Sequence, residues 1–344
     1  MSNKGLKYLL GILLATAVGA CKKDDGGSAG THPQYDKNYY GRQAFVIALN
    51  SNYQNYDSAL KQTGLIDTLA STGPFTTFLL SNNSLPPYSF PTDINFILKS
   101  LILPGNVSLK ALPFGRNQRF TSLMGNHIYL SKYPSGTDSA AYILNGTPVF
   151  AVDNSTTNGP LNVIDQTIPN LERYSSITGF VQGAKELTFL SLALRRTGLD
   201  KLLADTTRNF TFLAPADDAF KKSTDGDLNS YDGLLQADTA KLSRILRLHI
   251  IGERNFYTDL NRQLGNADTM AITTLLGNDP QIKFYASRQW WGATYYFIGP
   301  GNWDNSTNPP TAYPAGVYQI NWVPQQDKIA VNGVILELDN ILLP

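Results

Sequence analysis

The side chains best suited to catalysis are scarce in this sequence, which has three histidines and one cysteine in 344 residues. His32 lies in a polar segment near the N-terminus, and His127 precedes a short predicted strand at 128–130. His249 ends a series of residues with helical spacing, whose other members are Leu242, Ile245 and Leu246. It is either a catalytic or metal-binding imidazole, or a buried histidine hydrogen-bonded within the core. An internal repeat places Leu101 at the equivalent position, which favours the core interpretation.

No motif in the sequence supplies a catalytic constellation. The H-E-x-x-H, C-x-x-C, P-loop and G-x-G-x-x-G patterns do not occur, and a single cysteine cannot build a thiolate metal site. A G-x-S-x-G match at 26–30 has no strand before it and no helix after it, so it cannot form a nucleophile elbow. Asp217 and Asp218 are interpreted as helix-capping residues. We therefore expect no enzymatic activity, no cofactor and no metal site.

Aromatic residues gather between positions 285 and 322, and this stretch has no evident counterpart in the first half of the chain. Flat rings can stack on sugars or anchor a protein partner, because they bury a large area at a small entropic cost. They can equally extend the core, since neighbouring residues of a strand face opposite sides. The candidate ligand-binding residues are Trp290, Trp291, Tyr295, Tyr296, Trp303 and Trp322. Trp303, at the start of an Asn-, Pro- and Gly-rich loop, is the residue most expected to be exposed.

Composition predicts an ordinary globular protein of about two domains. The chain is 42% hydrophobic and 16% charged, with a net charge of +1. Its lysines and arginines are scattered along the sequence, whereas a nucleic-acid-binding surface needs a concentrated basic patch. We therefore expect no nucleic-acid partner.

The N-terminus has the pattern of an export signal ending at the only cysteine. Lys4 and Lys7 precede a short apolar run from Leu9 to Val18, which is too short to span a bilayer. Residues 18–21, Val-Gly-Ala-Cys, resemble the bacterial lipobox, in which the cysteine receives the lipid. The resemblance implies a signal peptide at 1–20, lipid attachment at Cys21 and anchoring to a membrane through acyl chains.

The segment after the cysteine predicts a charged signal followed by a tether. Residues 22–25, Lys-Lys-Asp-Asp, resemble the surface-export signal of Bacteroidetes lipoproteins, although a solvated charged linker would have the same composition. The following Gly-, Ser- and Pro-containing residues predict a flexible connection, so 21–38 is assigned as lipidated cysteine and tether. This implies a lipid-anchored protein of the outer membrane, exposed at the cell surface.

An internal repeat divides the remaining chain into two domains. Residues 59–65, ALKQTGL, match 193–199, ALRRTGL, and Thr77-Phe78-Leu79 match Thr211-Phe212-Leu213 without a gap. Farther on, 158–165 match 332–339. We place the first domain at 39–169 and the second at 170–344, with a linker at 170–176.

Each copy predicts a helix, a strand, further helices and then short strands. Ile94, Ile97, Leu98 and Leu101 have helical spacing, as do Leu187, Leu190 and Leu194, after which Gly198 is expected to end the helix. Strands are predicted at 128–130, 147–152, 272–276, 282–285 and 334–338. Because helices and strands are segregated along the chain, the predicted fold class is α+β.

Residues 210–220, FTFLAPADDAF, resemble the first signature of the fasciclin domain, and the later motifs of that family follow at the expected places. The matching residues in the second copy are Thr211, Pro215, Asp217, Phe220, His249, Asn332, Gly333 and Asp339. The first copy is degenerate: Leu80 and Ser81 replace the Ala-Pro of the signature, and Asn162 replaces the closing histidine. In the second copy Leu336 replaces that histidine.

The resemblance implies two tandem fasciclin-like domains, each a wedge-shaped β-sandwich flanked by helices. It also implies extracellular adhesion or ligand binding without catalysis. We therefore expect a surface-anchored binding lipoprotein of Bacteroidetes type, acting beside an outer-membrane porter complex or on a glycan. The alternative is an adhesin for other cells or for matrix.

Asp followed by Ser or Thr, and then by Ala, Leu, Met or Thr, recurs more often than the roughly one or two matches that composition would give. The pattern resembles the O-glycosylation signal of exported Bacteroidetes proteins, although both residue types also cap helices. The candidate acceptors are Ser58, Thr68, Ser139, Thr206, Thr239 and Thr269.

Overall fold

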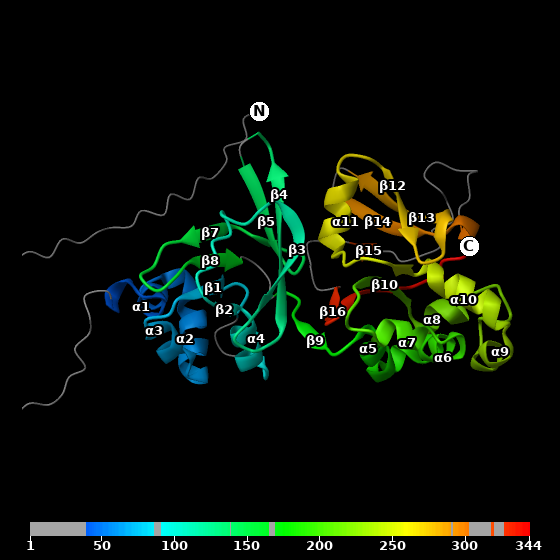
Figure 1. Ribbon diagram of the computed structural model, residues 1–344, viewed down its shortest axis with the longest axis horizontal. Coiled ribbons are helices and arrows are strands. Elements are labelled where there is room, and N and C mark those ends of the chain that lie inside the picture. Colours follow the sequence, from blue (N-terminus) through cyan, green and yellow to red (C-terminus); the bar gives the residue numbers. More distant parts are fainter. Residues whose placement is uncertain are drawn as a thin grey trace, which may run out of the picture. The chain divides into compact units, whose positions relative to one another are not determined.

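The computed structural model describes residues 39–85, 91–137, 139–164, 169–289, 292–302, 318–319 and 327–344. Residues from Lys37 to Pro344 form one compact unit, in which two α+β domains follow one another along the chain (Figure 1). This confirms the predicted fold class. Within the described ranges, every helix is too short or too polar to cross a lipid bilayer.

The first domain has two sheets and a group of helices. The helices are η1 (Tyr39–Gly41), α1 (Gln43–Ala48), η2 (Ser51–Tyr53), α2 (Gln54–Thr63), α3 (Leu65–Ala70) and α4 (Ile94–Ser100). The strands are β1 (Phe75–Leu80), β2 (Ile102–Pro104), β3 (Gly115–Thr121), β4 (His127–Ser135), β5 (Ser139–Leu144), β6 (Thr147–Val149), β7 (Ala151–Asn154) and β8 (Leu161–Ile164). They form sheets of order β2-β1-β8-β7 and β3-β4-β5-β6.

The second domain repeats this plan. Its helices are α5 (Ile177–Gly183), η3 (Lys185–Leu187), α6 (Thr188–Thr197), α7 (Leu199–Ala204), α8 (Asp217–Lys221), α9 (Tyr231–Gln236), α10 (Thr239–Leu248), α11 (Tyr257–Leu264) and η4 (Pro300–Asn302). Its strands are β9 (Glu172–Tyr174), β10 (Phe210–Pro215), β11 (Ile250–Ile251), β12 (Thr269–Thr274), β13 (Gly277–Gln289), β14 (Gly292–Ile298), β15 (Tyr318–Gln319), β16 (Lys328–Ala330) and β17 (Gly333–Leu338). The sheets have the orders β11-β10-β17-β16-β9 and β12-β13-β14-β15.

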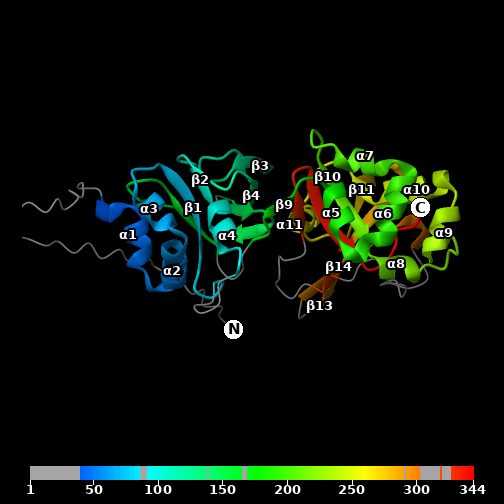
Figure 2. The ribbon, with the colours of Figure 1, turned by 90° about the horizontal axis from the view of Figure 1, so that it is seen from below.

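Strand β10 forms the centre of the second domain. It pairs with β17 in parallel and with β11 in antiparallel orientation, and all six of its residues are buried. Phe210, Phe212 and Ala214 pack into the core formed with the helices, whereas Leu213 packs into the core beneath the second sheet. This alternation is that of a strand covered on both faces. In Figures 1 and 2, α5 and α6 cover one side of this sheet.

The helices predicted from apolar spacing are confirmed. Leu242, Ile245, Leu246 and His249 are all buried on α10 or at its end. Gly198 ends α6 with φ of 71°, the left-handed conformation that glycine adopts without steric cost. The predicted strand at 147–152 is instead two strands, β6 and β7, which belong to different sheets and separate at Phe150.

The alignment of the two copies slips by one residue at β1. Thr211 Oγ1 donates to the carbonyl of Glu253 at 2.7 Å, and Thr211 is the first residue of β10 that pairs with β11. In the first domain the residue that makes this contact is Thr76, whose Oγ1 donates to the carbonyl of Gly105 at 2.9 Å. The ungapped match of Thr77 with Thr211 is therefore wrong.

A shorter loop explains the slip. Residues 71–74 connect α3 to β1, and the longer segment 205–209 connects α7 to β10. The Ala214-Pro215 positions consequently correspond to Leu79 and Leu80, not to Leu80 and Ser81. The loop before β1 is one residue shorter, but the similar residues on both sides of it can be aligned without a gap. The sequence alone therefore does not reveal the deletion.

The predicted linker at 170–176 contains a strand of the second domain. Its residues Glu172–Tyr174 form β9, which pairs in parallel with β16 at the edge of the five-stranded sheet. The connection between the domains is thus held by ladder hydrogen bonds and is not a free linker.

The aromatic stretch 285–322 is only in part an addition to the second domain. Its first part belongs to β13 and β14, a hairpin whose counterpart in the first domain is β4 and β5. The extra length lies between β14 and β15, where the first domain needs only Asn145 and Gly146 between β5 and β6. The expectation that the whole stretch lacks a counterpart was wrong, because the two hairpins share their strand order and not their sequence.

Candidate functional site

His249 is a structural residue of the second domain. Its side chain is fully buried. Nδ1 donates to the carbonyl of Ile245 at 2.9 Å, and Nε2 accepts from the N–H of Leu342 at 3.0 Å. Burial lowers the pKa of His249 from 6.5 to about 4, although the bond to Ile245 opposes part of that effect. An imidazole with both nitrogens bonded to backbone groups and no contact with solvent holds the end of α10 to the C-terminal segment.

Asn332 and Gly333 join helices α5 and α7 to the strand β17. The Asn332 amide accepts from the N–H of Ile177 at 2.8 Å and donates to the carbonyls of Leu203 and Asp205 at 2.8 and 3.1 Å. Any Cβ at Gly333 would lie 2.4 Å from the Phe210 carbonyl oxygen, so only glycine fits there. The amide of Asn158 makes the same three kinds of bond in the first domain.

Asp217 caps a different helix from the one expected. It is the first residue of α8, whose N-cap is Ala216. Its carboxylate instead accepts from the Phe189 N–H at 2.9 Å and the Thr188 hydroxyl at 2.5 Å, at the start of α6. The prediction was wrong about the partner because Phe189, at the start of α6, precedes Asp217 by 28 residues in the sequence and is brought to it by tertiary packing.

The remaining motif residues also support the fold. Pro215 ends β10, and Phe220 is buried and packs its ring against Phe189. The Asp339 carbonyl accepts from Lys222 Nζ at 3.3 Å. These residues stabilise the fold, so a functional surface has to be sought elsewhere.

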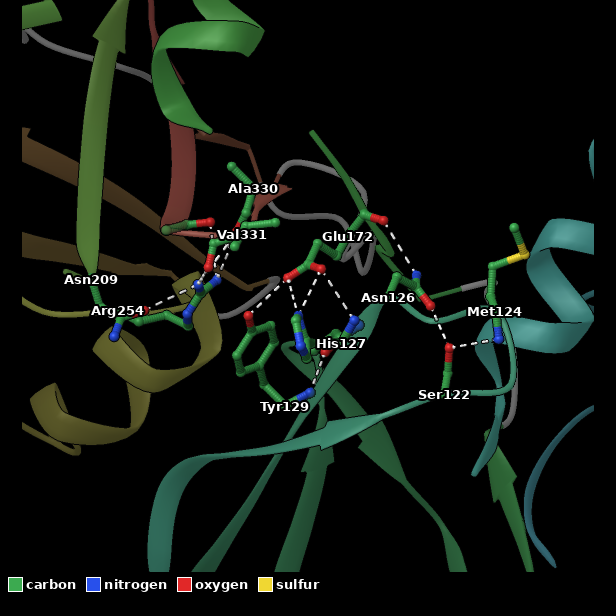
Figure 3. Close-up of polar contacts among 12 residues, drawn as sticks. Ser122, Met124, Asn126, His127, Tyr129, Glu172, Asn209, Arg254, Ala330 and Val331 are labelled. Atoms are coloured by element: carbon green, nitrogen blue, oxygen red, sulfur yellow. Dashed lines mark hydrogen bonds and ion pairs between the residues drawn. The ribbon is translucent and has the colours of Figure 1, made fainter. Parts of the chain in front are cut away.

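Polar contacts across the boundary of the two domains centre on Glu172 (Figure 3). Its carboxylate, only 4% exposed, accepts from His127 Nδ1 at 2.9 Å and from the Tyr129 hydroxyl at 2.9 Å. Asn126 Nδ2 donates to the Glu172 carbonyl at 3.2 Å. The start of the second domain is therefore bound to β4 of the first.

Arg254 lies on the Tyr129 ring and is 6% exposed. Its Cζ is 4.0 Å from the ring centroid, the geometry of a cation–π contact. Every hydrogen-bond acceptor of its guanidinium is neutral: the carbonyls of Ala330, Val331 and Gly333 and the amide oxygen of Asn209. Burial lowers the pKa of Arg254, while nearby Glu172 and Tyr129 raise it. The side chain carries a buried positive charge without a directly bonded carboxylate.

A second set of contacts surrounds Asp259. Its carboxylate accepts from the Tyr133 hydroxyl, from Asn117 Nδ2 at 3.2 Å and from the Phe256 N–H at 2.9 Å. Burial raises the pKa of Asp259, and these hydrogen bonds lower it. Two residues of the first domain thus share a carboxylate of the second.

A cleft of about 740 Å³ opens beside these contacts. Strand β3 of the first domain lines it from one side, and the segments before β10 and after β11 line it from the other. The lining residues are Arg116, Asn117, Arg119, Tyr129, Thr207, Arg208, Asn209, Gly252, Glu253 and Arg254. Four arginines and a single carboxylate among these described residues make the cleft electropositive.

The aromatic candidates divide into two groups. Trp290, Trp291, Trp303 and Trp322 lie outside the described residues. Tyr295 and Tyr296 lie on β14 and are each 8% exposed, and the Tyr295 ring stacks on Phe284 with centroids 5.6 Å apart. Their burial favours the alternative that these rings extend the core, and it holds for both tyrosines, although neighbouring strand residues were expected to face opposite sides.

The modification candidates occupy varied surroundings. Thr239 begins α10 behind the cap Asp238, and Ser58 lies within α2 and donates to the Gln54 carbonyl. Thr206 and Thr269 are exposed, as is Ser139, while Thr68 is half-buried. Cys21 lies outside the described residues. Lipidation and glycosylation stay predictions.

Sequence reasoning missed the cleft arginines. Arg116 Nη1 donates to Asn255 Oδ1 at 2.7 Å across 139 positions of sequence. No local spacing signals such a contact, and the first-domain and second-domain arginines occur in unrelated segments. Among the described residues, no group of three or more His, Cys, Asp or Glu side chains is placed to hold a metal ion.

Comparison with known proteins matches the sequence to one family model. The sequence model of the fasciclin domain matches residues 51–169 and 185–344. Among solved structures, the chain is similar to the FAS1 domain pair of the insect cell adhesion molecule Fasciclin I. The two share 16% identity with a TM-score of 0.39, and the match covers 86% of this chain and 98% of that one. No curated protein sequence matched the chain.

Proposed function

The chain belongs to the fasciclin-domain family, and on that premise we propose that it is a non-catalytic binding lipoprotein displayed at the outer membrane. Domains of this family are generally binding modules without catalysis. The observation that carries the proposal is that both fasciclin matches fill most of the chain. The histidine best placed for chemistry, His249, is fully engaged in the core.

The N-terminal sequence supports the anchored location. A positive segment, a short apolar run and a cysteine preceded by small residues are the features of lipoprotein export, with lipid added at Cys21. Two or three acyl chains hold a protein firmly on a membrane, whereas one binds reversibly. The charged residues 22–25 then direct the protein to the outside of the cell.

The ligand that we propose is a glycan, or a porter complex that imports one. Polar groups outnumber apolar ones around the cleft, and this favours a ligand rich in hydroxyl groups over an apolar peptide. An adhesin for cells or matrix is the competing assignment, and the experiment is chosen to separate the two.

Affinity electrophoresis of the purified full-length chain tests the proposal. Native gels containing neutral or acidic polysaccharides should retard the protein, while beads coated with it should neither clump nor bind cells. Clumping without retardation would replace glycan binding by adhesion. A chain that neither moves more slowly nor binds cells would contradict a binding role. The Cys21→Ser variant tests the anchor, since it should leave the membrane fraction and keep the same retardation.

A further inference from the structure

The cleft between the domains contains more positive charge than its own carboxylate can balance. Arg116 Nη2 forms an ion pair with Glu253 at 3.2 Å, which accounts for one of the four arginines. Arg254 is bonded to neutral acceptors alone. Within the described part of the chain, the exposed guanidiniums of Arg119 and Arg208 have neither a hydrogen-bond acceptor nor an ion-pair partner.

Neighbouring carboxylates offset only part of this excess. Hydrogen bonds from the hydroxyl and N–H of Thr207 lower the pKa of Asp205, and Arg208 lies close enough to add to that effect. The Glu172 carboxylate opposes part of the lowering of the Arg254 pKa by burial, but it forms no hydrogen bond with that side chain, because its oxygens are bonded to His127 and to the Tyr129 hydroxyl (Figure 3). Asp259 is bonded to Tyr133 and Asn117. A concave surface with charge of one sign raises the local concentration of ions of the opposite sign. The buried charge of Arg254 adds to the field because little water screens it.

The chemistry of the lining also restricts the ligand. Arginine presents a planar fork that matches a carboxylate or sulfate group through paired hydrogen bonds. Thr207 and Asn209 add a hydroxyl and an amide group that can bond to sugar hydroxyls. Arg254 covers the face of the Tyr129 ring, so that ring is not available to an apolar side chain. The volume of about 740 Å³ falls within the usual range for sites that take small ligands.

We propose that this cleft binds an acidic oligosaccharide, with Arg119 and Arg208 contacting its carboxylate or sulfate groups. The inference rests on the glycan-binding role proposed above and assigns it a site and a charge class. Since one arginine comes from each domain, the site is complete only when both domains are in place. Arg254 positions the cleft wall and supplies charge from beneath it.

Isothermal titration calorimetry on the full-length chain in detergent tests the assignment. The probes are tetragalacturonate, which has only carboxylates, a carrageenan tetrasaccharide, which has only sulfates, and the neutral cellotetraose. The two acidic probes distinguish the two sources of negative charge. We expect one or both to bind, with affinity falling as salt is added, and cellotetraose to bind far more weakly.

Two variants locate the site. Arg119→Gln and Arg208→Gln should each weaken binding of the acidic probe about tenfold or more, since each removes one charge-assisted contact. The matched control is Arg244→Gln, because Arg244 is exposed on α10 and does not line the cleft. It should leave the dissociation constant unchanged. Among the described residues, neither Arg119 nor Arg208 supports the fold through a hydrogen bond, and Arg208 only lies over the Phe210 ring with its Cζ 5.1 Å from the centroid. All three variants should therefore unfold close to the wild-type temperature.

The outcomes separate the two proposals. Acidic probes that bind equally well to wild type and to both cleft variants would overturn the cleft assignment and leave glycan binding intact. Tighter binding of cellotetraose than of the acidic probes would likewise overturn the cleft assignment and leave glycan binding intact. Failure of every probe here, together with unretarded migration in polysaccharide gels, would overturn both.

Discussion

The hydrogen bonds of His249 make a specific prediction about stability in acid. Its Nδ1–H must donate to the Ile245 carbonyl, and its Nε2 must accept from the Leu342 N–H. A proton added to Nε2 would face an N–H group inside the core. The folded protein therefore keeps this histidine neutral, while the unfolded chain protonates it near pH 6.5.

The size of the effect follows from the two pKa values. Each pKa unit corresponds to about 1.36 kcal/mol, so a fall from 6.5 to about 4 is worth about 3 kcal/mol. Because the folded pKa is the lower of the two, this stabilisation is fully present above pH 6.5. It is lost progressively as the pH falls towards 4, where the folded state also takes up the proton.

The His249→Leu variant isolates this contribution, since Leu101 occupies the equivalent position in the first domain. At neutral pH it should be less stable by about 2–4 kcal/mol, because two buried backbone groups lose their partners. The deficit should shrink by up to about 3 kcal/mol towards pH 4. Urea unfolding of both proteins at several pH values measures this difference in the free energy of unfolding. The control Leu101→Ala should lose about 2–5 kcal/mol at every pH. A His249→Leu deficit that stays constant across this range would refute the reasoning.

Three further predictions concern polar side chains that support the fold. Asp217→Ala removes the cap of α6 and should cost about 1 kcal/mol in urea unfolding; an unchanged midpoint would show that the cap contributes nothing. Asn332→Ala removes three buried hydrogen bonds and should cost about 3–5 kcal/mol, with a comparable loss for Asn158→Ala; a loss below about 1 kcal/mol in both would contradict the bonding described. Burial raises the pKa of Asp327 to about 8, so its stabilising protonated form is lost as the pH rises. The free energy of unfolding of Asp327→Asn should therefore rise relative to that of wild type by up to about 1.4 kcal/mol per pH unit between pH 5 and 8. A difference between the two proteins that does not depend on pH would refute the raised pKa.

Features with a local period could be predicted from the sequence. The apolar face of α10 follows from four residues within one helix, and the end of α6 follows from one glycine. Such patterns depend on backbone geometry alone, which the sequence carries in its spacing. The division into two copies was likewise visible, because similar segments recur in the same order.

Features that depend on tertiary packing could not be predicted. Asp217 was correctly recognised as a capping residue, but its helix was not, since the carboxylate reaches a segment 28 residues away. Residues 170–176 were assigned as a linker because they lie between the two copies, yet β9 pairs with β16, more than 150 positions later. The one-residue slip at β1 became visible only through the partners of Thr76 and Thr211.

The candidate cleft belongs to this second class. Arg119 lies on β3 and Arg208 precedes β10, so nothing in either local sequence relates the two. The aromatic stretch attracted attention because its residues are close in sequence, but Tyr295 and Tyr296 belong to the core. Proximity in sequence drew attention to two tyrosines that are buried, whereas the arginines come together only in the fold.

Crosslinking on intact cells with a membrane-impermeant reagent tests the central claim most directly. The account predicts that the reagent reaches this protein and joins it to an outer-membrane porter or to a glycan-bearing component. Mass spectrometry of the adducts would identify the partner. Absence of any adduct on intact cells, with adducts appearing only after lysis, would contradict display at the surface and the binding role built on it.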